Sequence, residues 1–127
     1  MIEKSKNRLL IVDDSSMVRR AIARFLEEFE IEVIAFAEDG NTALDLFKKL
    51  KPDLVTLDVT MPGLDGLEVL SEMVKINTSV KIMVITALVD KSLGLTAIRK
   101  GAKSYLTKPF GPQKLKKAFT QLLNQTA

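Results

Sequence analysis

Five short apolar runs alternate with five segments of helical periodicity, and this alternation is the strongest constraint on how the chain can fold. The apolar runs show little polar alternation, which indicates strands that are covered on both faces. Strands that alternate with helices form parallel sheets, because each helix carries the chain back across the sheet. The pattern therefore predicts an α/β fold made of five consecutive βα units.

The predicted elements follow one another without a linker or a low-complexity segment. The expected strands are Leu9–Val12, Glu32–Phe36, Leu54–Leu57, Lys81–Thr86 and Ser104–Leu106. The expected helices cover about residues 16–29, 39–50, 64–76, 90–100 and 112–123. Ser15 or Ser16 can cap the first helix, Asp39 or Gly40 opens the second, and Gly101 suits the position after the fourth. These elements account for the 127 residues, which predicts a single domain.

Composition narrows the class of protein. Hydrophobic residues make up 46% of the chain and charged residues 28%, as in globular proteins. No apolar run approaches the ~20 residues of a membrane span, and the first one stops too soon for a signal peptide. We therefore expect a cytoplasmic protein without a membrane partner. The net charge of +3 comes without a recognisable nucleic-acid-binding module, so we expect no nucleic-acid partner either.

Two residue types that the sequence lacks limit the catalytic and metal-binding chemistry it can support. The chain contains no cysteine and no histidine, which excludes disulfides, thiolate chemistry, Ser-His-Asp triads and most transition-metal sites. A metal bound here would be a hard cation held by oxygen atoms, such as Mg²⁺. No GxxxxGK[ST] or GxGxxG motif follows a strand, so tight nucleotide binding is not indicated.

Polar residues stand where four of the predicted strands end. Asp13 and Asp14 follow the first strand, Asp58 the third, Thr86 ends the fourth, and Lys108 follows the fifth. Parallel α/β sheets bind ligands outside the carboxyl ends of their strands. Two adjacent carboxylates repel each other by roughly 3–4 kcal/mol at an effective dielectric constant of about 20, so a cation is expected between them.

This set of side chains is suited to phosphoryl transfer onto a carboxylate. A carboxylate can attack phosphorus and form an aspartyl phosphate, and the reaction needs mainly positioning and charge neutralisation. Asp58 is the natural nucleophile because it ends the middle strand. Asp13 and Asp14 would hold Mg²⁺, Lys108 would pair with the acceptor carboxylate, and Thr86 would donate a hydrogen bond to the phosphoryl group.

Four motifs carry a resemblance to a known family. IVDDSS, DLVTLDVTMPGLDG, VITA and YLTKPF resemble, in order and spacing, the receiver domain of two-component response regulators. The resemblance covers essentially the whole chain and is closest to stand-alone, CheY-type chemotaxis proteins. It implies a doubly wound parallel sheet with strand order 2-1-3-4-5 and a single receiver domain over residues 1–127, without an output domain. It also implies a self-catalysing phosphoacceptor rather than a turnover enzyme.

The resemblance also implies a site and a phosphodonor. Asp58 would take its phosphoryl group from the phosphohistidine of a sensor histidine kinase. Mg²⁺ would be bound by Asp14, Asp58 and the carbonyl oxygen of Thr60, with Asp13 acting through water. Lys108 would contact the phosphoryl group, and the Lys108–Pro109 peptide bond would be cis.

A conformational switch is implied as well. On phosphorylation Thr86 would move toward the phosphate and Tyr105 would turn inward. The face that contains Tyr105, Lys91 and Phe110 would then meet a downstream protein, of which the flagellar motor switch is one candidate. We expect a monomer, and the sequence leaves dimerisation on phosphorylation open. Thr60 and Leu88 occupy positions that affect the phosphate lifetime in this family, and apolar Leu88 predicts a long one.

Other residues have plainer interpretations. Gly66 is interpreted as loop punctuation, Met17 as core or helix-face packing, and Arg19 as part of a solvated helix face. Three rival functions remain beside an output receiver: a phosphate sink or relay intermediate, a pseudo-receiver, and an aspartate-based phosphatase of the haloacid dehalogenase type. The phosphatase would need a second acid two residues after Asp58, where this chain has Thr60.

Overall fold

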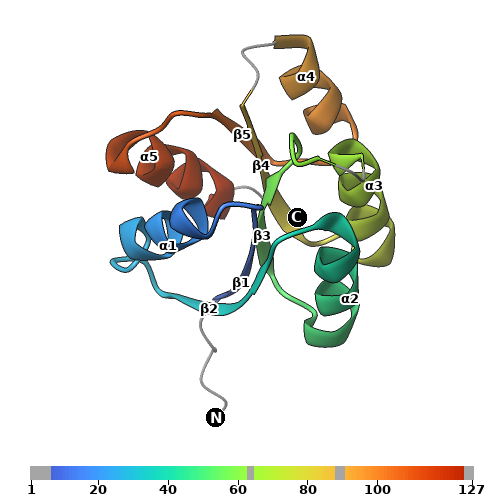
Figure 1. Cartoon of the computed structure of the whole chain (residues 1–127), viewed down its shortest axis with the longest axis horizontal. Coiled ribbons are helices and arrows are strands. Elements are labelled where there is room, and N and C mark those ends of the chain that lie inside the picture. The colour runs from blue at the N-terminus through green and yellow to red at the C-terminus, as the bar shows by residue number, and fades with distance from the viewer. Residues whose placement is uncertain (1–6, 63–64, 88–90, 125–127) are drawn as a thin grey trace.

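The computed structural model describes residues 7–62, 65–87 and 91–124, and the Lys91 side chain lies outside that description. In this part of the chain a parallel sheet in the order β2-β1-β3-β4-β5 has helices on both faces (Figure 1). The strands are β1 (Asn7–Val12), β2 (Ile31–Ala37), β3 (Leu54–Asp58), β4 (Lys81–Thr86) and β5 (Ser104–Thr107). The helices are α1 (Ser16–Phe25), α2 (Gly40–Leu50), α3 (Gly66–Ile76), α4 (Lys91–Arg99) and α5 (Pro112–Leu123). The predicted fold class and strand order are confirmed.

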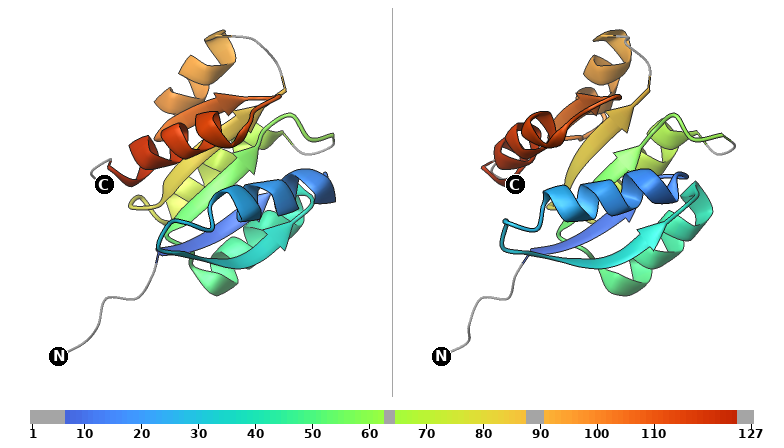
Figure 2. Two further views of the ribbon diagram at one scale, coloured as in Figure 1. Left: turned by 90° about the vertical axis from the view of Figure 1, so that its left-hand side faces the viewer. Right: turned by 60° about the vertical axis from the view of Figure 1, so that its left-hand side comes forward.

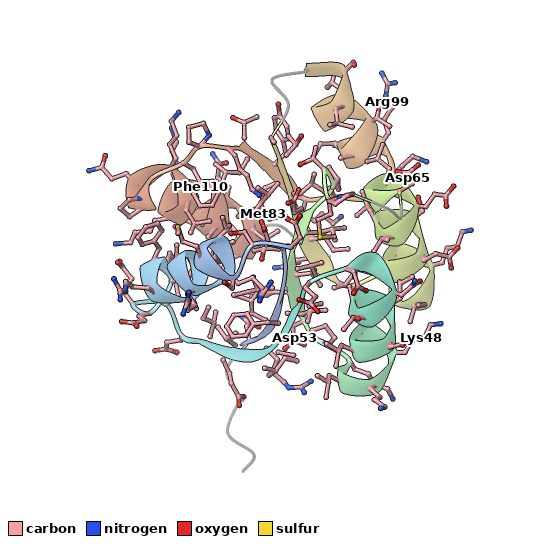
Figure 3. All side chains as sticks on the ribbon, in the orientation of Figure 1. Lys48, Asp53, Asp65, Met83, Arg99 and Phe110 are labelled. Carbon is pink, nitrogen blue, oxygen red and sulfur yellow. The ribbon has the colours of Figure 1, made fainter. Side chains whose placement is uncertain are left out.

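Two hydrophobic cores lie on opposite faces of the sheet, because alternate residues of each strand point to opposite sides. Leu9, Ile11 and Met83 belong to the core under α1 and α5, whereas Leu10 and Val12 belong to the core under α2, α3 and α4. Figure 2 shows α1 and α5 side by side on their face. Met83, near the centre of Figure 3, has no exposed surface. Complete burial of such a side chain contributes about 1.5–3 kcal/mol.

Helix α1 ends at Phe25, four residues before the predicted end. The prediction was wrong because the apolar spacing continues into the following turn. Leu26 caps the helix and is fully buried. Phe29 still packs against the core, and its ring forms a T-shaped pair with that of Phe119 at a centroid distance of 5.0 Å. Apolar periodicity therefore marks the buried face here and not the extent of the helix.

Side-chain caps define where three helices begin. Ser15 Oγ accepts a hydrogen bond from the Val18 N–H at 3.2 Å, and Asp39 accepts one from Thr42 at 2.7 Å. Asp65 caps α3, so this helix begins at Gly66 rather than at residue 64, which lies outside the described part. Gly101 follows α4 with φ of 115°, as its sequence position predicted. The caps on α1 and α3 lie in the segments that follow β1 and β3.

Gly66 is not loop punctuation, and that interpretation was wrong. It is a buried residue at the first position of α3, and it lies directly against Val59. A Cβ atom at Gly66 would stand 2.4 Å from the Val59 Cα and 2.8 Å from the Val59 carbonyl oxygen. The start of α3 therefore approaches the backbone just after β3 as closely as a glycine allows.

None of the helices in the described part of the chain has the length and apolar character that a membrane crossing requires.

Candidate functional site

Three acidic side chains meet at the carboxyl edge of the sheet. Asp13 and Asp14 directly follow β1, and Asp58 is the last residue of β3. One ligand oxygen of each carboxylate lies within 4.8 Å of those of the other two. Asp13 and Asp58 are buried, whereas Asp14 is exposed to solvent. The convergence that was predicted from the strand ends is present in the structure.

Lys108 bridges two of these acids from the end of β5. Its Nζ atom lies 3.0 Å from Asp13 Oδ2 and 3.0 Å from Asp58 Oδ2. Its backbone N–H donates to the carbonyl oxygen of Thr86 at 2.8 Å, which ties it to the end of β4. The Lys108–Pro109 peptide bond is cis, as the resemblance implied. The ammonium contact with Asp13 is an addition to what the sequence suggested.

The charges in this cluster shift one another's proton affinities. Burial raises the pKa of Asp13 above its ordinary value of 3.8, and the Asp58 charge adds to this. The hydrogen bond from the Ser15 N–H and the contact with Lys108 offset the shift only in part. Burial by itself would lower the pKa of Lys108, but its contacts with Asp13 and Asp58 outweigh burial and raise that pKa. The ammonium therefore stays charged at neutral pH.

Asp58 is held at both carboxylate oxygens. Oδ2 faces Lys108, and Oδ1 accepts hydrogen bonds from the Thr60 backbone N–H at 2.8 Å and the Thr60 hydroxyl at 2.7 Å. The Thr60 hydroxyl in turn accepts a hydrogen bond from the Ala87 N–H at 3.1 Å. The sequence pointed to the backbone carbonyl of Thr60 and to phosphate lifetime, and it did not indicate this side-chain link.

Arg19 also belongs to the surroundings of the site. Its Nη1 atom donates to the carbonyl oxygen of Asp13 at 2.7 Å, so its assignment to a solvated helix face was wrong. Arg20 and Arg24, on the same helix, are exposed. Met17 does not pack into the core, because 74% of its surface is exposed. Both departures concern α1, whose first turn rises beside the acidic cluster.

The residues proposed for the switch lie on β4 and β5, away from α1. Thr86 is buried at the end of β4, in register with Thr107, and Tyr105 is half-buried on β5 opposite Val84. The Tyr105 ring rests on Gly94 of α4, where an added Cβ atom would come within 2.7–3.0 Å of it. Phe110 packs against the core under α1 and α5. Leu88 and the Lys91 side chain lie outside the described part, so their predicted roles stay predictions.

The acidic cluster fits a magnesium ion by its chemistry. Three carboxylates offer only oxygen ligands, and exposed Asp14 leaves the cluster open to solvent. Asp13 Oδ2 is buried, and its ion pair with Lys108 lacks the geometry of a hydrogen bond. Such an under-satisfied buried oxygen is a favourable position for a cation or a bridging water.

The raised pKa of Asp13 predicts a pH-dependent effect of the Asp13→Asn substitution. The folded protein holds this proton more tightly than the unfolded chain, so the ionised carboxyl lowers stability once the pH exceeds 3.8 and rises through the folded pKa. We expect Asp13→Asn to match the wild type near pH 3 and to exceed its free energy of unfolding at pH 7, where the wild-type carboxyl has lost its proton. Urea unfolding without divalent cations across this range measures the difference. A stability difference that does not vary with pH would contradict the prediction.

The arrangement at this sheet edge defines a class of protein. Residues 9–120 match the response regulator receiver domain family, and the chain belongs to that family. It is therefore a receiver of two-component phosphorelay signalling.

Its relatives include several chemotaxis proteins. The chain is 41% identical over 103 residues to chemotaxis protein CheY of Listeria monocytogenes, covering 81% of this chain and 87% of the relative. It is 38% identical over 118 residues to CheY of Bacillus subtilis, covering 93% of this chain and 98% of the relative. The structure also resembles a CheX–CheY–BeF3–Mg²⁺ complex from Borrelia burgdorferi, with a TM-score of 0.88, 29% identity and coverage of 94% and 90%.

Proposed function

We propose that Asp58 is the phosphoacceptor of this receiver and that a sensor histidine kinase supplies the phosphoryl group. The observation that carries the proposal is the buried Asp58 carboxylate at the end of β3, held by Lys108 at 3.0 Å and next to two further acids. An Asp58 oxygen forms a bond to the phosphorus of phosphohistidine while the P–N bond breaks. The electron pair of that bond stays on the imidazole nitrogen, which takes up a proton.

The residues around Asp58 have complementary roles in this proposal. Asp14, Asp58 and the Thr60 carbonyl oxygen would hold Mg²⁺, with Asp13 contributing through water. A bound Mg²⁺ supplies positive charge that offsets the charge of the phosphoryl oxygens. Lys108 neutralises the acceptor carboxylate and then faces a phosphoryl oxygen, and Thr86 donates a hydrogen bond to the phosphoryl group. Such fixed charges are the main source of catalysis in phosphoryl transfer.

The output of the proposed reaction is a change at the α4–β5–α5 face. Thr86 and Tyr105 would transmit phosphorylation to this face, which would also include Lys91 and Phe110. The downstream partner would be a protein such as a flagellar motor switch, and the chemotaxis relatives support this choice. We propose further that the chain acts in the cytoplasm as a monomeric single-domain receiver that is not a turnover enzyme.

A groove beside the acceptor suits the protein that carries the phosphohistidine. It has a volume of about 570 Å³, and Ala87 and Lys108 belong to its lining. The other six lining residues are all apolar: Met17, Val18, Ala21, Phe25, Pro109 and Phe110. Phe110 lies on the side of the molecule that α1 and α5 cover (Figure 3). Because Lys108 borders both the groove and Asp58, a helix seated there would bring its histidine to the acceptor.

Intact-mass spectrometry with acetyl phosphate and Mg²⁺ tests the acceptor assignment. We expect one labile phosphoryl adduct on the wild type, and none on Asp58→Asn or in the presence of a chelator. The amide has almost the same shape as the carboxylate but is a poor nucleophile, so a folded Asp58→Asn protein without an adduct identifies the acceptor. An adduct on the variant, or one that forms in the chelator, would contradict the proposal.

Met17→Lys is expected to slow transfer from a phosphorylated histidine kinase. With lysine at this position, the partner no longer buries an apolar side chain in the groove. That burial is worth about 1.5–3 kcal/mol, so the affinity for the kinase should fall at least about tenfold. The measured quantity is the ratio of the kinase-dependent rate to the acetyl phosphate rate for each protein. Met17→Leu, which keeps an apolar side chain, is the matched control. An equal ratio for the two variants would rule out docking in this groove.

A further inference from the structure

The Thr60 hydroxyl occupies a central position between the acceptor and the end of β4. It donates to Asp58 Oδ1 at 2.7 Å and accepts from the Ala87 N–H at 3.1 Å. A hydroxyl has a single proton to donate, so its bond to Asp58 turns its lone pairs toward other donors. The two contacts therefore form one continuous chain from the Ala87 N–H through Thr60 to the acceptor carboxylate.

We propose that this chain is a positioning link that forms only while Asp58 is unphosphorylated, so that Thr60 sets the affinity of the site for a phosphoryl group. The inference rests on the proposed function, because it takes Asp58 as the acceptor. Thr60 acts through its neighbours: it orients Asp58 Oδ1 and occupies the Ala87 N–H. This role belongs to its side chain and is separate from the metal contact proposed for its backbone carbonyl.

The chemistry of an acyl phosphate explains why the link would break. Once an Asp58 oxygen is bonded to phosphorus, the carboxyl group loses its negative charge and becomes a weaker acceptor for the Thr60 hydroxyl. The phosphoryl group brings oxygens that carry most of the new negative charge, and these are stronger acceptors for an N–H than a neutral hydroxyl is. The Ala87 N–H, two hydrogen bonds away from Asp58, then has a better partner than Thr60.

The link consequently stabilises the unphosphorylated state alone. An interaction present in only one of two states shifts the equilibrium between them by its full free energy. Removal of the hydroxyl should therefore favour phosphoryl binding rather than weaken it, although Thr60 touches the acceptor directly. This direction is opposite to the one expected for a residue that merely holds Asp58 in a reactive position.

The test compares Thr60→Val, which keeps the shape of the side chain, with Thr60→Ser, which keeps the hydroxyl. The measurement is the Kd of beryllium fluoride, a phosphoryl mimic, determined by calorimetry at a fixed saturating Mg²⁺ concentration. Loss of a charge-assisted hydrogen bond corresponds to about a tenfold change, so Thr60→Val should bind about tenfold more tightly than the wild type. Thr60→Ser should return the Kd to within about twofold of the wild-type value.

Two further measurements separate the outcomes. The Mg²⁺ affinity of each protein, measured alone, corrects for any change at the Thr60 carbonyl. The Ala87 amide signal in the wild-type NMR spectrum should move when beryllium fluoride binds, and it should move in Thr60→Val before any ligand is added. Unchanged or weaker binding by Thr60→Val, or equal shifts in the valine and serine variants, would overturn the inference. A wild type that binds no beryllium fluoride would instead contradict Asp58 as the acceptor.

Discussion

Lys108→Met is expected to lower both the phosphorylation rate and the stability of the protein. The ammonium is shared by Asp13 and Asp58, both buried, at 3.0 Å from each. Loss of a preorganised charge at the reacting group slows chemistry by about a hundredfold or more. Removal of one partner from a buried ion pair also costs about 3–5 kcal/mol, because the remaining charges are left uncompensated. Acetyl phosphate kinetics and urea unfolding at pH 7 measure the two effects.

The loss of stability in Lys108→Met should become smaller as the pH falls. This pH dependence distinguishes an electrostatic cause of the loss from a packing defect. Without Lys108 the pKa of Asp13 has lost a lowering influence, so the folded variant takes up a proton at a higher pH than the wild type. Its free energy of unfolding then approaches that of the wild type between neutral pH and pH 4. Lys117→Met removes the same charge from an exposed position of α5 and is the control. An equal loss at pH 7 and pH 4 would indicate a packing defect instead.

Gly66→Ala is expected to destabilise the fold by about 3 kcal/mol, the upper range for an overpacked site. The new methyl group would stand 2.4 Å from the Val59 Cα, and backbone atoms cannot give way as a flexible side chain can. Either α3 moves outward or the segment after β3 shifts. Thermal and urea unfolding measure the loss. Because Val59 directly follows Asp58, the shift should also alter the amide signals around the acceptor.

Gly111→Ala is the matched control for this substitution. A Cβ atom at Gly111 meets no atom within 4 Å, and the residue precedes α5 with an extended backbone. Alanine is a poorer helix cap than glycine, so we expect a loss below about 1 kcal/mol. Similar losses for the two variants would mean that the contact between Gly66 and Val59 does not constrain the fold.

The sequence was most informative where chemistry depends on strand order. Strand ends of a parallel sheet share one edge, so Asp13, Asp14, Asp58 and Lys108 could be brought together from the succession of elements alone. It was less informative where a contact depends on the path of a loop. The chain after α1 folds back so that Phe29 reaches Phe119, and apolar spacing does not distinguish this from a longer helix.

Two missed features have a common physical cause. The Thr60 hydroxyl bridge depends on the direction of one side chain in the segment after β3, and Arg19 reaches the Asp13 carbonyl through one extended side-chain conformation. No spacing rule encodes either choice. The close contact at Gly66 was open to prediction, since glycine is used where two backbones approach closely. Glycine is also common in tight turns, so its identity alone does not distinguish the two cases.

The excess of acids over bases at the sheet edge links phosphorylation to ion supply. Three ionised carboxylates and one ammonium leave a formal charge of −2, and one divalent cation would bring this to zero. A phosphoryl group on Asp58 adds negative charge, so cation and phosphoryl group should strengthen each other's binding by the same factor. Under the proposed reaction, the phosphorylated fraction of the protein would therefore depend on the free divalent cation concentration as well as on the kinase.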